Sequence, residues 1–277
     1  MLRPSPAPAR GILRRNLDAS HMTHGRYLPD DALAPFVEHY WSVGWDLRGQ
    51  PPRLQETMPH PNVHAVVDAA GSGLFGVHTR RFAVELAGQG RVFGIKFRPG
   101  GFRPFLRRPV APLANRSLPF AEVFGADGTA YERDVLACTD VEACVALSAH
   151  LLTAHRPPAD PTVARVAGIV TLAATDLAVN TAEELAGRSG LGLRALQRLF
   201  NDYVGASPKW VINRYRLHEA IERLAAGTAV DWTELALSLG YYDQAHFNRD
   251  FRQLVGRSPG EFARAERVGT PDGQRNP

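Results

Sequence analysis

ELAGRSGLGLRALQRLFNDYVGASP (residues 184–208) is followed by a second, matching stretch, ELALSLGYYDQAHFNRDFRQLVGRSP (residues 234–259). The Glu-Leu-Ala triplets lie 50 positions apart (234 − 184), whereas the Ser-Pro pairs lie 51 apart (258 − 207). One extra residue in the turn of the second copy accounts for this difference. Each copy predicts a capped helix, a turn at a glycine (Gly190 or Gly240) and a second helix, which together make a helix-turn-helix unit.

Local signals place the ends of these helices. Thr181-Ala-Glu-Glu184 and Asp231-Trp-Thr-Glu234 each offer a capping oxygen followed three residues later by glutamate. Ser207-Pro208 and Ser258-Pro259 each offer a cap followed by proline at the first helical position. Gly227 is placed to end the helix that starts at Pro208. This connecting helix would be roughly 28 Å long, close to the ~34 Å repeat of DNA, so both second helices can enter successive major grooves.

The second helix of each copy divides into an apolar face and a polar face. In the first copy the polar face carries Arg194, Gln197, Arg198 and Asn201, at i, i+3, i+4 and i+7. In the second copy it carries Gln244, Asn248, Arg249 and Arg252. The repeat pairs Gln197 with Asn248 and Arg198 with Arg249. Such pairs suit the edges of adenine and guanine in the major groove.

The stretches GRSGLGLRALQRLFNDYVGASPKWVINRYRLHEAIERLAAG (187–227) and ELALSLGYYDQAHFNRDFRQLVGRSPGEF (234–262) resemble the DNA-binding domain of the AraC/XylS family of bacterial transcription regulators. The resemblance covers about residues 163–264. It implies binding to double-stranded DNA and contact with RNA polymerase. Carried over to this chain, the base-reading positions are Arg194, Gln197, Arg198, Gln244, Asn248 and Arg249. His246 is either a packing or a phosphate-contact residue, and Ala245 occupies a contact position without hydrogen-bonding capacity.

Phosphate contacts are predicted from a second group of polar residues. Lys209, Arg214 and Arg216 in the connecting helix are candidates, as are the helix starts at Thr181 and Asp231. A solvated surface charge is the alternative for each of them. Residues 181–264 contain 11 Lys and Arg against 10 Asp and Glu, a difference of one. This surplus is small for a DNA-binding domain, so local placement of charge has to provide the attraction.

Length and composition indicate two domains. A chain of 277 residues exceeds what one core usually serves, and its 44% hydrophobic and 22% charged residues are typical of a globular protein. The net charge of +4 permits nucleic acid as a partner. We expect a disordered extension over 1–21 (with Met22 as an alternative start), a front domain over 22–155 and a Pro-rich linker over 156–161. The DNA-binding domain is expected over 162–265, and a disordered tail over 266–277.

The front half predicts an α+β domain. Short β-branched or aromatic runs at 37–47, 63–68, 73–78, 82–87 and 91–98 predict strands. The stretches GFRPFL, LPFAEVFG and 141–155 predict short helices. The strands favour a small β-barrel or sandwich, cupin-like or related. APFVEHYWSVGW, HPNVHAVVD and RVFGIKFRPGGFRPFL resemble the front domain of a less-studied subgroup of the same family, which implies effector binding or dimerisation.

Candidate ligand-binding residues lie on the predicted strands and turns. Tyr40, Trp41 and Trp45 either line an apolar pocket for a small-molecule effector or pack in the core. His60 and His64, with His78 and Glu85, superficially resemble a metal-binding cupin, but an HxH pair is absent, so we expect no metal and no cofactor. A basic stretch fits an anionic effector, an acidic partner or a solvated face. It comprises Arg98, Arg103, Arg107 and Arg108. The helix over 141–155 is the candidate homodimer interface.

Other functional classes receive less support. A DNA-repair alkyl-transfer protein needs a cysteine cluster in the front domain, and the chain has only Cys138 and Cys144. An enzymatic front domain is the main alternative, although no nucleophile elbow, P-loop or dinucleotide motif supports it. A front half that serves only dimerisation or RNA-polymerase contact stays open. From the two thiols we expect a reducing cytoplasm. We also expect no signal peptide, since the start has no adequate apolar stretch, and no membrane span, since no apolar run approaches ~20 residues.

Overall fold

The computed structural model describes residues 3–5, 21–225 and 231–268. The strands of the front half are β1 (Met22–Tyr27), β2 (Val37–Leu47), β3 (Arg53–Thr57), β4 (His64–Asp68), β5 (Gly73–Phe75), β6 (Phe82–Leu86), β7 (Gly88–Phe97) and β8 (Ser117–Leu118). Its helices are α1 (Arg103–Leu106), the 3₁₀ turn η1 (Ala111–Leu113), α2 (Phe120–Ala137) and α3 (Val141–Ala154). The predicted α+β class of this half is confirmed.

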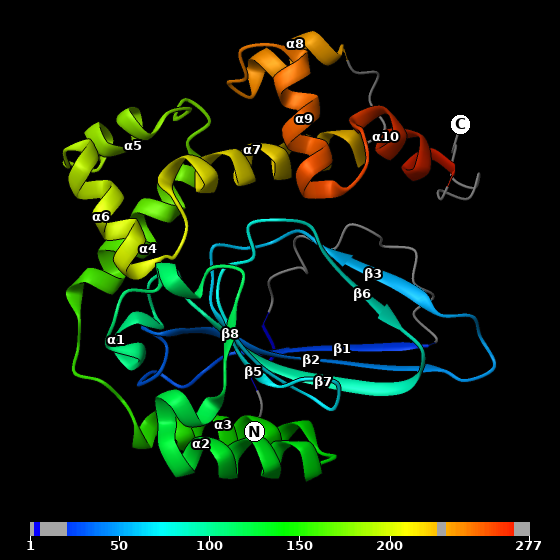
Figure 1. Cartoon of the computed structure of the whole chain (residues 1–277), viewed down its shortest axis with the longest axis vertical. Helices are drawn as coiled ribbons and strands as arrows, with labels where there is room; N and C mark the ends of the chain where they lie inside the picture. Colours follow the sequence, from blue (N-terminus) through cyan, green and yellow to red (C-terminus); the bar gives the residue numbers. More distant parts are fainter. Residues whose placement is uncertain (1–2, 6–20, 226–230, 269–277) are drawn as a thin grey trace.

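A long antiparallel pair, β2 with β7, forms the centre of the main sheet, whose strand order is β1-β2-β7-β4-β5-β8. The pair runs from Val37 opposite Phe97 to Leu47 opposite Gly88. Beyond this point the chain continues from β2 into β3 and enters β7 from β6, and β3 and β6 pair with each other as a second antiparallel sheet (Figure 1). Gly88 has a φ of 59°, a left-handed conformation that glycine adopts without steric cost, and this permits the sharp turn from β6 into β7.

The strands form two open sheets rather than a closed barrel. Among the described residues, β1 and β8 are the outer strands of the main sheet, and β3 and β6 form a separate two-stranded sheet. The prediction of a barrel was therefore wrong, and a cupin-like fold is not supported. The β2–β7 pair ends at Leu47 and Gly88, and in the described part of the chain the neighbouring segments β3 and β6 pair only with each other. They therefore do not connect the outer strands β1 and β8, as a closed barrel would require.

Three other elements differ from the expectation. β1 and β3 were not predicted, because MTHGRY and RLQET lack an apolar alternation. α2 is longer than the predicted LPFAEVFG helix and extends to Ala137, with a break at Gly125, which has a φ of 61° and a ψ of −140°. The glycine accommodates a change of direction that an L-residue would resist.

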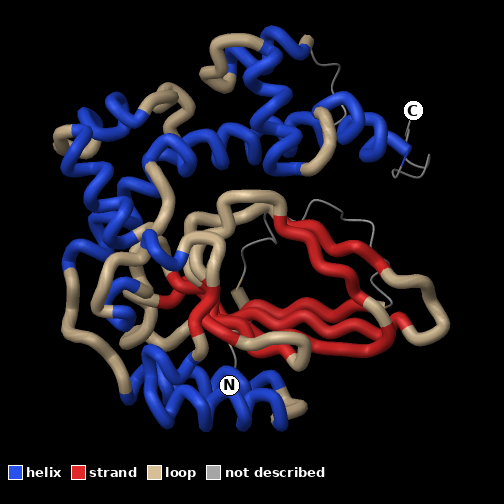
Figure 2. Tube along the Cα trace, viewed as in Figure 1, coloured by secondary structure: helices blue, strands red, loops and turns tan. Residues whose placement is uncertain are grey.

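The core of the front domain lies between the main sheet and the helices α2 and α3, which cover one face (Figure 2). Tyr40, Phe93 and Ile95 project from the sheet into this core, and Phe120, Tyr131 and Leu152 project from the helices. The Tyr131 hydroxyl lies 2.8 Å from the Ser148 hydroxyl, so this buried polar pair is satisfied.

The second half is helical, as predicted. It contains α4 (Pro161–Thr175), α5 (Ala182–Arg188), α6 (Leu193–Tyr203), α7 (Pro208–Ala225), α8 (Trp232–Ser238), α9 (Gln244–Val255) and α10 (Pro259–Val268). Figure 1 shows α5 and α6 at one end of α7, with α8 and α9 at the other. α4 begins inside the predicted linker, where Asp160 accepts a hydrogen bond from the Thr162 amide.

Several expectations concern the ends of the chain and one loop. Residues 3–5 pair with the end of β1, through a bridge between Pro4 and Tyr27. The rest of the predicted extension up to residue 20, Gly227 and the predicted tail beyond residue 268 lie outside the described residues. α10 includes residues 266–268, which were expected to belong to that tail. Within the described residues, no helix combines the length and the apolar character that crossing a membrane requires.

Candidate nucleic-acid interface

The first helix-turn-helix unit consists of α5 and α6. Thr181 and Glu184 form the predicted capping box, in which each side chain accepts a hydrogen bond from the backbone of the other residue. Gly190, with a φ of 64°, makes the turn, and Leu196 and Phe200 bury the inner face of α6. These local features fix the orientation of α6, so its polar face points away from the core.

The polar face of α6 is accessible. Its four predicted DNA-contact residues are exposed, and none has a hydrogen bond or ion pair within the described part of the chain. They are Arg194, Gln197, Arg198 and Asn201. Side chains that are free of partners can hydrogen-bond to base edges without first breaking a contact in the protein.

The second unit, α8 and α9, repeats this arrangement with differences. Asp231 caps α8, and Asp243 caps α9 by accepting from the His246 amide at 2.7 Å. Arg249 is exposed, whereas Gln244 and Asn248 are partly buried. The Gln244 side-chain oxygen accepts a long hydrogen bond of 3.5 Å from the Thr233 hydroxyl. The second polar face is therefore present but less open than the first.

His246 is held within its own helix. Its Nε2 lies 3.6 Å from an Asp250 carboxylate oxygen, and its ring packs edge-on against Tyr241. The same carboxylate accepts from the Asn213 amide of α7 at 3.0 Å. These contacts favour the packing role for His246 over a contact with DNA.

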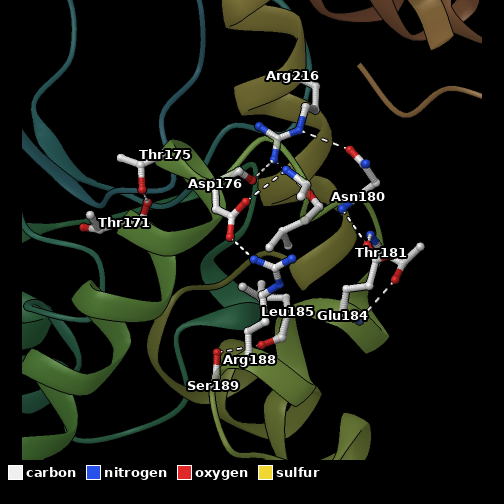
Figure 3. A network of polar contacts seen from close by, with 12 residues as sticks. Thr171, Thr175, Asp176, Asn180, Thr181, Glu184, Leu185, Arg188, Ser189 and Arg216 are labelled. Carbon is white, nitrogen blue, oxygen red and sulfur yellow. Dashed lines mark hydrogen bonds and ion pairs between the residues drawn. The ribbon is translucent and has the colours of Figure 1, made fainter. Parts of the chain in front are cut away.

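Arg214 and Arg216 do not lie on the DNA-facing surface, contrary to the prediction. Both side chains are buried, at 2% and 1% exposure. Arg216 donates to the backbone carbonyls of Asp176 at 2.7 Å and Val179 at 2.8 Å, joining α7 to the segment between α4 and α5 (Figure 3). Burial excludes both guanidinium groups from phosphate contact in this conformation. The helical spacing of the sequence was compatible with a buried Arg214, because Arg214 lies three positions from Val211 and from Leu217, which are both buried apolar residues.

Lys209 is exposed, as a phosphate contact requires. Its ammonium group donates to the Asn180 carbonyl at 3.1 Å, next to the cap at Thr181. The Lys209 charge therefore lies beside the start of α5, where a phosphate would also meet the positive end of that short helix.

The front domain contacts both helix-turn-helix units. Val77 belongs to the hydrophobic core of the first unit, and Met58 belongs to that of the second. Trp210 at the start of α7 donates its indole N–H to the Thr79 carbonyl at 3.2 Å. Arg214 donates to the Pro59 carbonyl at 2.8 Å, and its guanidinium lies 3.0 Å from Nδ1 of His60. His60 is thus an interdomain residue, which its sequence context did not reveal.

A further interdomain contact lies at the end of α6. The Val110 amide donates to the Asp202 carbonyl at 2.9 Å, and Arg103 donates to the Asp202 carboxylate at 2.7 Å. Arg103, predicted as part of a basic effector or partner surface, instead forms an ion pair between the domains. All of these contacts leave the polar faces of α6 and α9 uncovered.

The predicted ligand residues divide between the two faces of the main sheet. Tyr40 packs in the core beneath α2 and α3, and this burial raises the pKa of its hydroxyl. Strand alternation places Trp41 and Trp45 on the opposite face, where their indoles lie over Gly94 and Gly90. The Trp45 N–H donates to the Ala87 carbonyl at 3.2 Å. The Trp41 N–H is buried and has no hydrogen-bond partner among the described residues.

Buried polar groups share the face that carries Trp41. Lys96 pairs with Glu38 at 2.9 Å, and Asn62 donates to the same carboxylate at 3.2 Å. His64 lies opposite Lys96 in the sheet; its burial, together with the nearby positive charge, lowers the pKa of its imidazole to about 3. His64 is therefore neutral at physiological pH. No cluster of three metal-ligating side chains occurs in the described ranges.

Comparison with known proteins finds similarity in two separate stretches of the chain. A model of a helix-turn-helix domain matches residues 185–265, and a model of a domain of unknown function, DUF6597, matches residues 25–119. The HTH-type transcriptional activator RhaS of Escherichia fergusonii is 37% identical over 80 residues, which are 29% of this chain. The helical half of the chain is thus similar to regulators of the AraC/XylS family, as its sequence predicts. The match spans only 28% of the length of that RhaS relative.

Solved structures of the AraC/XylS family are also similar. A probable AraC family transcriptional regulator from Rhodopseudomonas palustris has 28% sequence identity and a TM-score of 0.34. It covers 37% of this chain and 97% of its own. ToxT from Vibrio cholerae strain SCE256, solved with an unsaturated fatty acid bound, covers 95% of this chain and 97% of its own, with 12% identity and a TM-score of 0.39.

Proposed function

We propose that this protein is a sequence-specific DNA-binding transcription regulator of the AraC/XylS family that reads two successive major-groove segments. One observation carries the proposal. Two helices in equivalent positions of two repeated units, α6 and α9, present polar faces, of which that of α6 is exposed at all four predicted contact residues and that of α9 is exposed at Arg249 and partly buried at Gln244 and Asn248. α7 separates the units by a length close to one turn of DNA.

The proposed base contacts follow from the side chains on these faces. Arg194 and Arg198 of α6 and Arg249 of α9 suit guanine, because a guanidinium can donate to O6 and N7 together. Gln197, Gln244 and Asn248 suit adenine through their amide groups. Asn201 lies further along the exposed face of α6, where it would contact the end of the first of the two DNA segments.

Selection of sites from random double-stranded DNA tests this function. The purified full-length chain should enrich a site with two short blocks about 10.5 base pairs apart, centre to centre. Enrichment of one block only would mean that a single unit reads DNA. Failure to enrich any sequence at low salt would reject the proposal.

We further propose that the front domain senses a small molecule and transmits its binding through α7. Trp41, Lys96 and His64 would form part of the effector site, because the Trp41 indole N–H is buried without a protein partner and lies beside polar groups. Met58, Val77 and Arg214 would form the route to DNA, since they join the front domain to both helix-turn-helix units. Contact with RNA polymerase and homodimerisation through α3 stay predictions.

Two measurements test this coupling. Native mass spectrometry of the full-length chain with a mixture of small metabolites should detect a bound species that Trp41→Ala loses. Met58→Ala should change the affinity for the selected DNA without changing the bases that are read. If no small molecule binds, the front domain serves as a brace for the two units and the sensor proposal fails.

A further inference from the structure

The extra residue of the second repeat can be located from the turns of the two units. In the first unit the Leu191 amide donates to the Ala186 carbonyl at 2.9 Å, and in the second the Tyr241 amide donates to the Ala236 carbonyl at 3.0 Å. Leu191 and Tyr241 are thus equivalent. The next helix is capped at Gly192 in the first unit and at Asp243 in the second. Tyr242 is therefore the residue without a counterpart.

Tyr242 is exposed to an unusual degree. Its exposed fraction is 89%, the largest among the exposed large hydrophobic residues of the described chain, whereas its neighbour Tyr241 is 5% exposed and packs on Phe247. Tyr242 thus contributes nothing to the core of its own unit. It directly precedes Asp243, the cap of α9, so it lies at the end of the helix that would enter the groove.

Few cations of the described second unit remain free to bind phosphates, because Arg249 is proposed to read a base, Arg252 lies 3.8 Å from Glu261 and the Arg257 guanidinium lies over the Phe262 ring. Several basic side chains of the helical half are already engaged within the protein: Arg188 with Asp176, Arg214 with Pro59, Arg216 with Asp176 and Val179, Arg223 with Glu219, and Arg252 with Glu261. Neutral donors therefore have to provide part of the backbone contact. A tyrosine hydroxyl is one of the groups that proteins use to contact phosphate oxygens.

We propose that Tyr242 is a DNA-backbone contact of the second unit, whose hydroxyl donates to a phosphate at the edge of the groove occupied by α9 and whose ring packs against the adjacent sugar. This inference rests on the proposed DNA-binding function. The first unit has no equivalent, because Gly192 occupies its cap directly after Leu191. The contact therefore positions α9 without reading sequence and compensates for the more enclosed polar face of the second unit.

Binding titrations with the full-length chain and its selected DNA site test the proposal. Tyr242→Ala should weaken binding about tenfold, the effect of losing a hydrogen bond to a charged group. A contact with the DNA backbone does not depend on the base sequence. The loss of affinity should therefore be the same on the selected site and on sites in which the bases of the second block are changed. Leu237→Ala, at another exposed apolar residue of the second unit, should bind as wild type, and thermal unfolding should confirm that both variants are folded.

A modified phosphate identifies the contact. Neutral methylphosphonates are placed one at a time along the strands that border the second block. At one position the methylphosphonate should weaken binding of the wild-type protein. At the same position it should not weaken binding of Tyr242→Phe, because that variant already lacks the hydroxyl that donates to this phosphate. Additive losses at every position, or wild-type affinity of Tyr242→Ala, would overturn the inference. A wild-type chain that binds no DNA would instead reject the proposed function.

Discussion

At the scale of single residues, Arg198 and Arg249 provide the sharpest test of base reading. They occupy equivalent positions in α6 and α9 and are both exposed. Arg198→Ala and Arg249→Ala should each weaken binding to the selected site by about 1–3 kcal/mol and relax the base preference in one block only. Titration against the selected site and against sites altered in each block measures both effects.

A matched control separates base reading from general electrostatics. Arg165 is exposed on α4 and belongs to neither of the two proposed base-reading faces, so Arg165→Ala should change affinity little. If Arg198→Ala weakened binding to selected and random DNA equally, Arg198 would be a phosphate contact. The same comparison applies to Arg249.

His64 predicts a pH dependence of stability. Its pKa is about 3 in the folded chain and 6.5 as its ordinary value. Between these values the unfolded chain binds a proton that the folded chain excludes, so the free energy of unfolding falls as the pH drops below 6.5. The contribution approaches about 1.4 kcal/mol per pH unit well below 6.5. Chemical denaturation from pH 7.5 to 4.5 should give a shallower decline for His64→Phe than for the wild type.

The comparison variant is His150→Phe. His150 is exposed on α3, and this substitution should leave the pH dependence unchanged. A His64→Phe protein with the same slope as the wild type would show that His64 is accessible to a proton in the folded state.

At the scale of elements, the buried Arg216 attaches α7 to the segment between α4 and α5. Arg216 donates to the carbonyls of Asp176 and Val179. Arg216→Met would remove both hydrogen bonds and leave the buried Val179 carbonyl without this donor, whereas the Asp176 carbonyl keeps a hydrogen bond from the Val179 amide. We expect a loss of roughly 2–5 kcal/mol in the free energy of unfolding. Lys209→Met, at an exposed residue of the same helix, should cost about 1 kcal/mol or less. Equal losses for the two variants would contradict the structural role of Arg216.

The elements differ in how far the sequence predicts them. The caps at Thr181 and Asp231 and the turns at Gly190 and Gly240 were predictable, because each depends on residues that are close together in the chain. The pairing of β3 with β6 was not, because the two strands lie 25 residues apart (82 − 57) and β3, RLQET, has no apolar alternation that would have predicted it as a strand. Helical spacing was compatible with the burial of Arg214 and Arg216. Their positive charge nevertheless favoured the prediction that both residues are exposed and contact phosphates.

At the scale of the whole molecule, the contacts between the domains were beyond prediction from sequence. Met58 and Val77 belong to apolar clusters whose other members lie in the second half of the chain. Neither residue differs locally from an ordinary core residue of the front domain. His60 was a candidate ligand residue for the same reason, since nothing near it in the sequence indicates that Arg214 lies beside it. Long-range packing alone determines these roles.

The charge distribution of the whole molecule leads to a last prediction. Residues 181–264 carry 11 basic and 10 acidic side chains, and two of the arginines, Arg214 and Arg216, are buried. Few phosphates can then be neutralised, and the logarithm of the binding constant should fall with the logarithm of salt concentration with a slope of about −4 or shallower. Titrations between 50 and 200 mM salt measure this slope. A slope steeper than about −4 would contradict this prediction. Release of Arg214 from the Pro59 carbonyl of the front domain would by itself steepen the slope by only about 1, because each additional phosphate contact adds about −0.9.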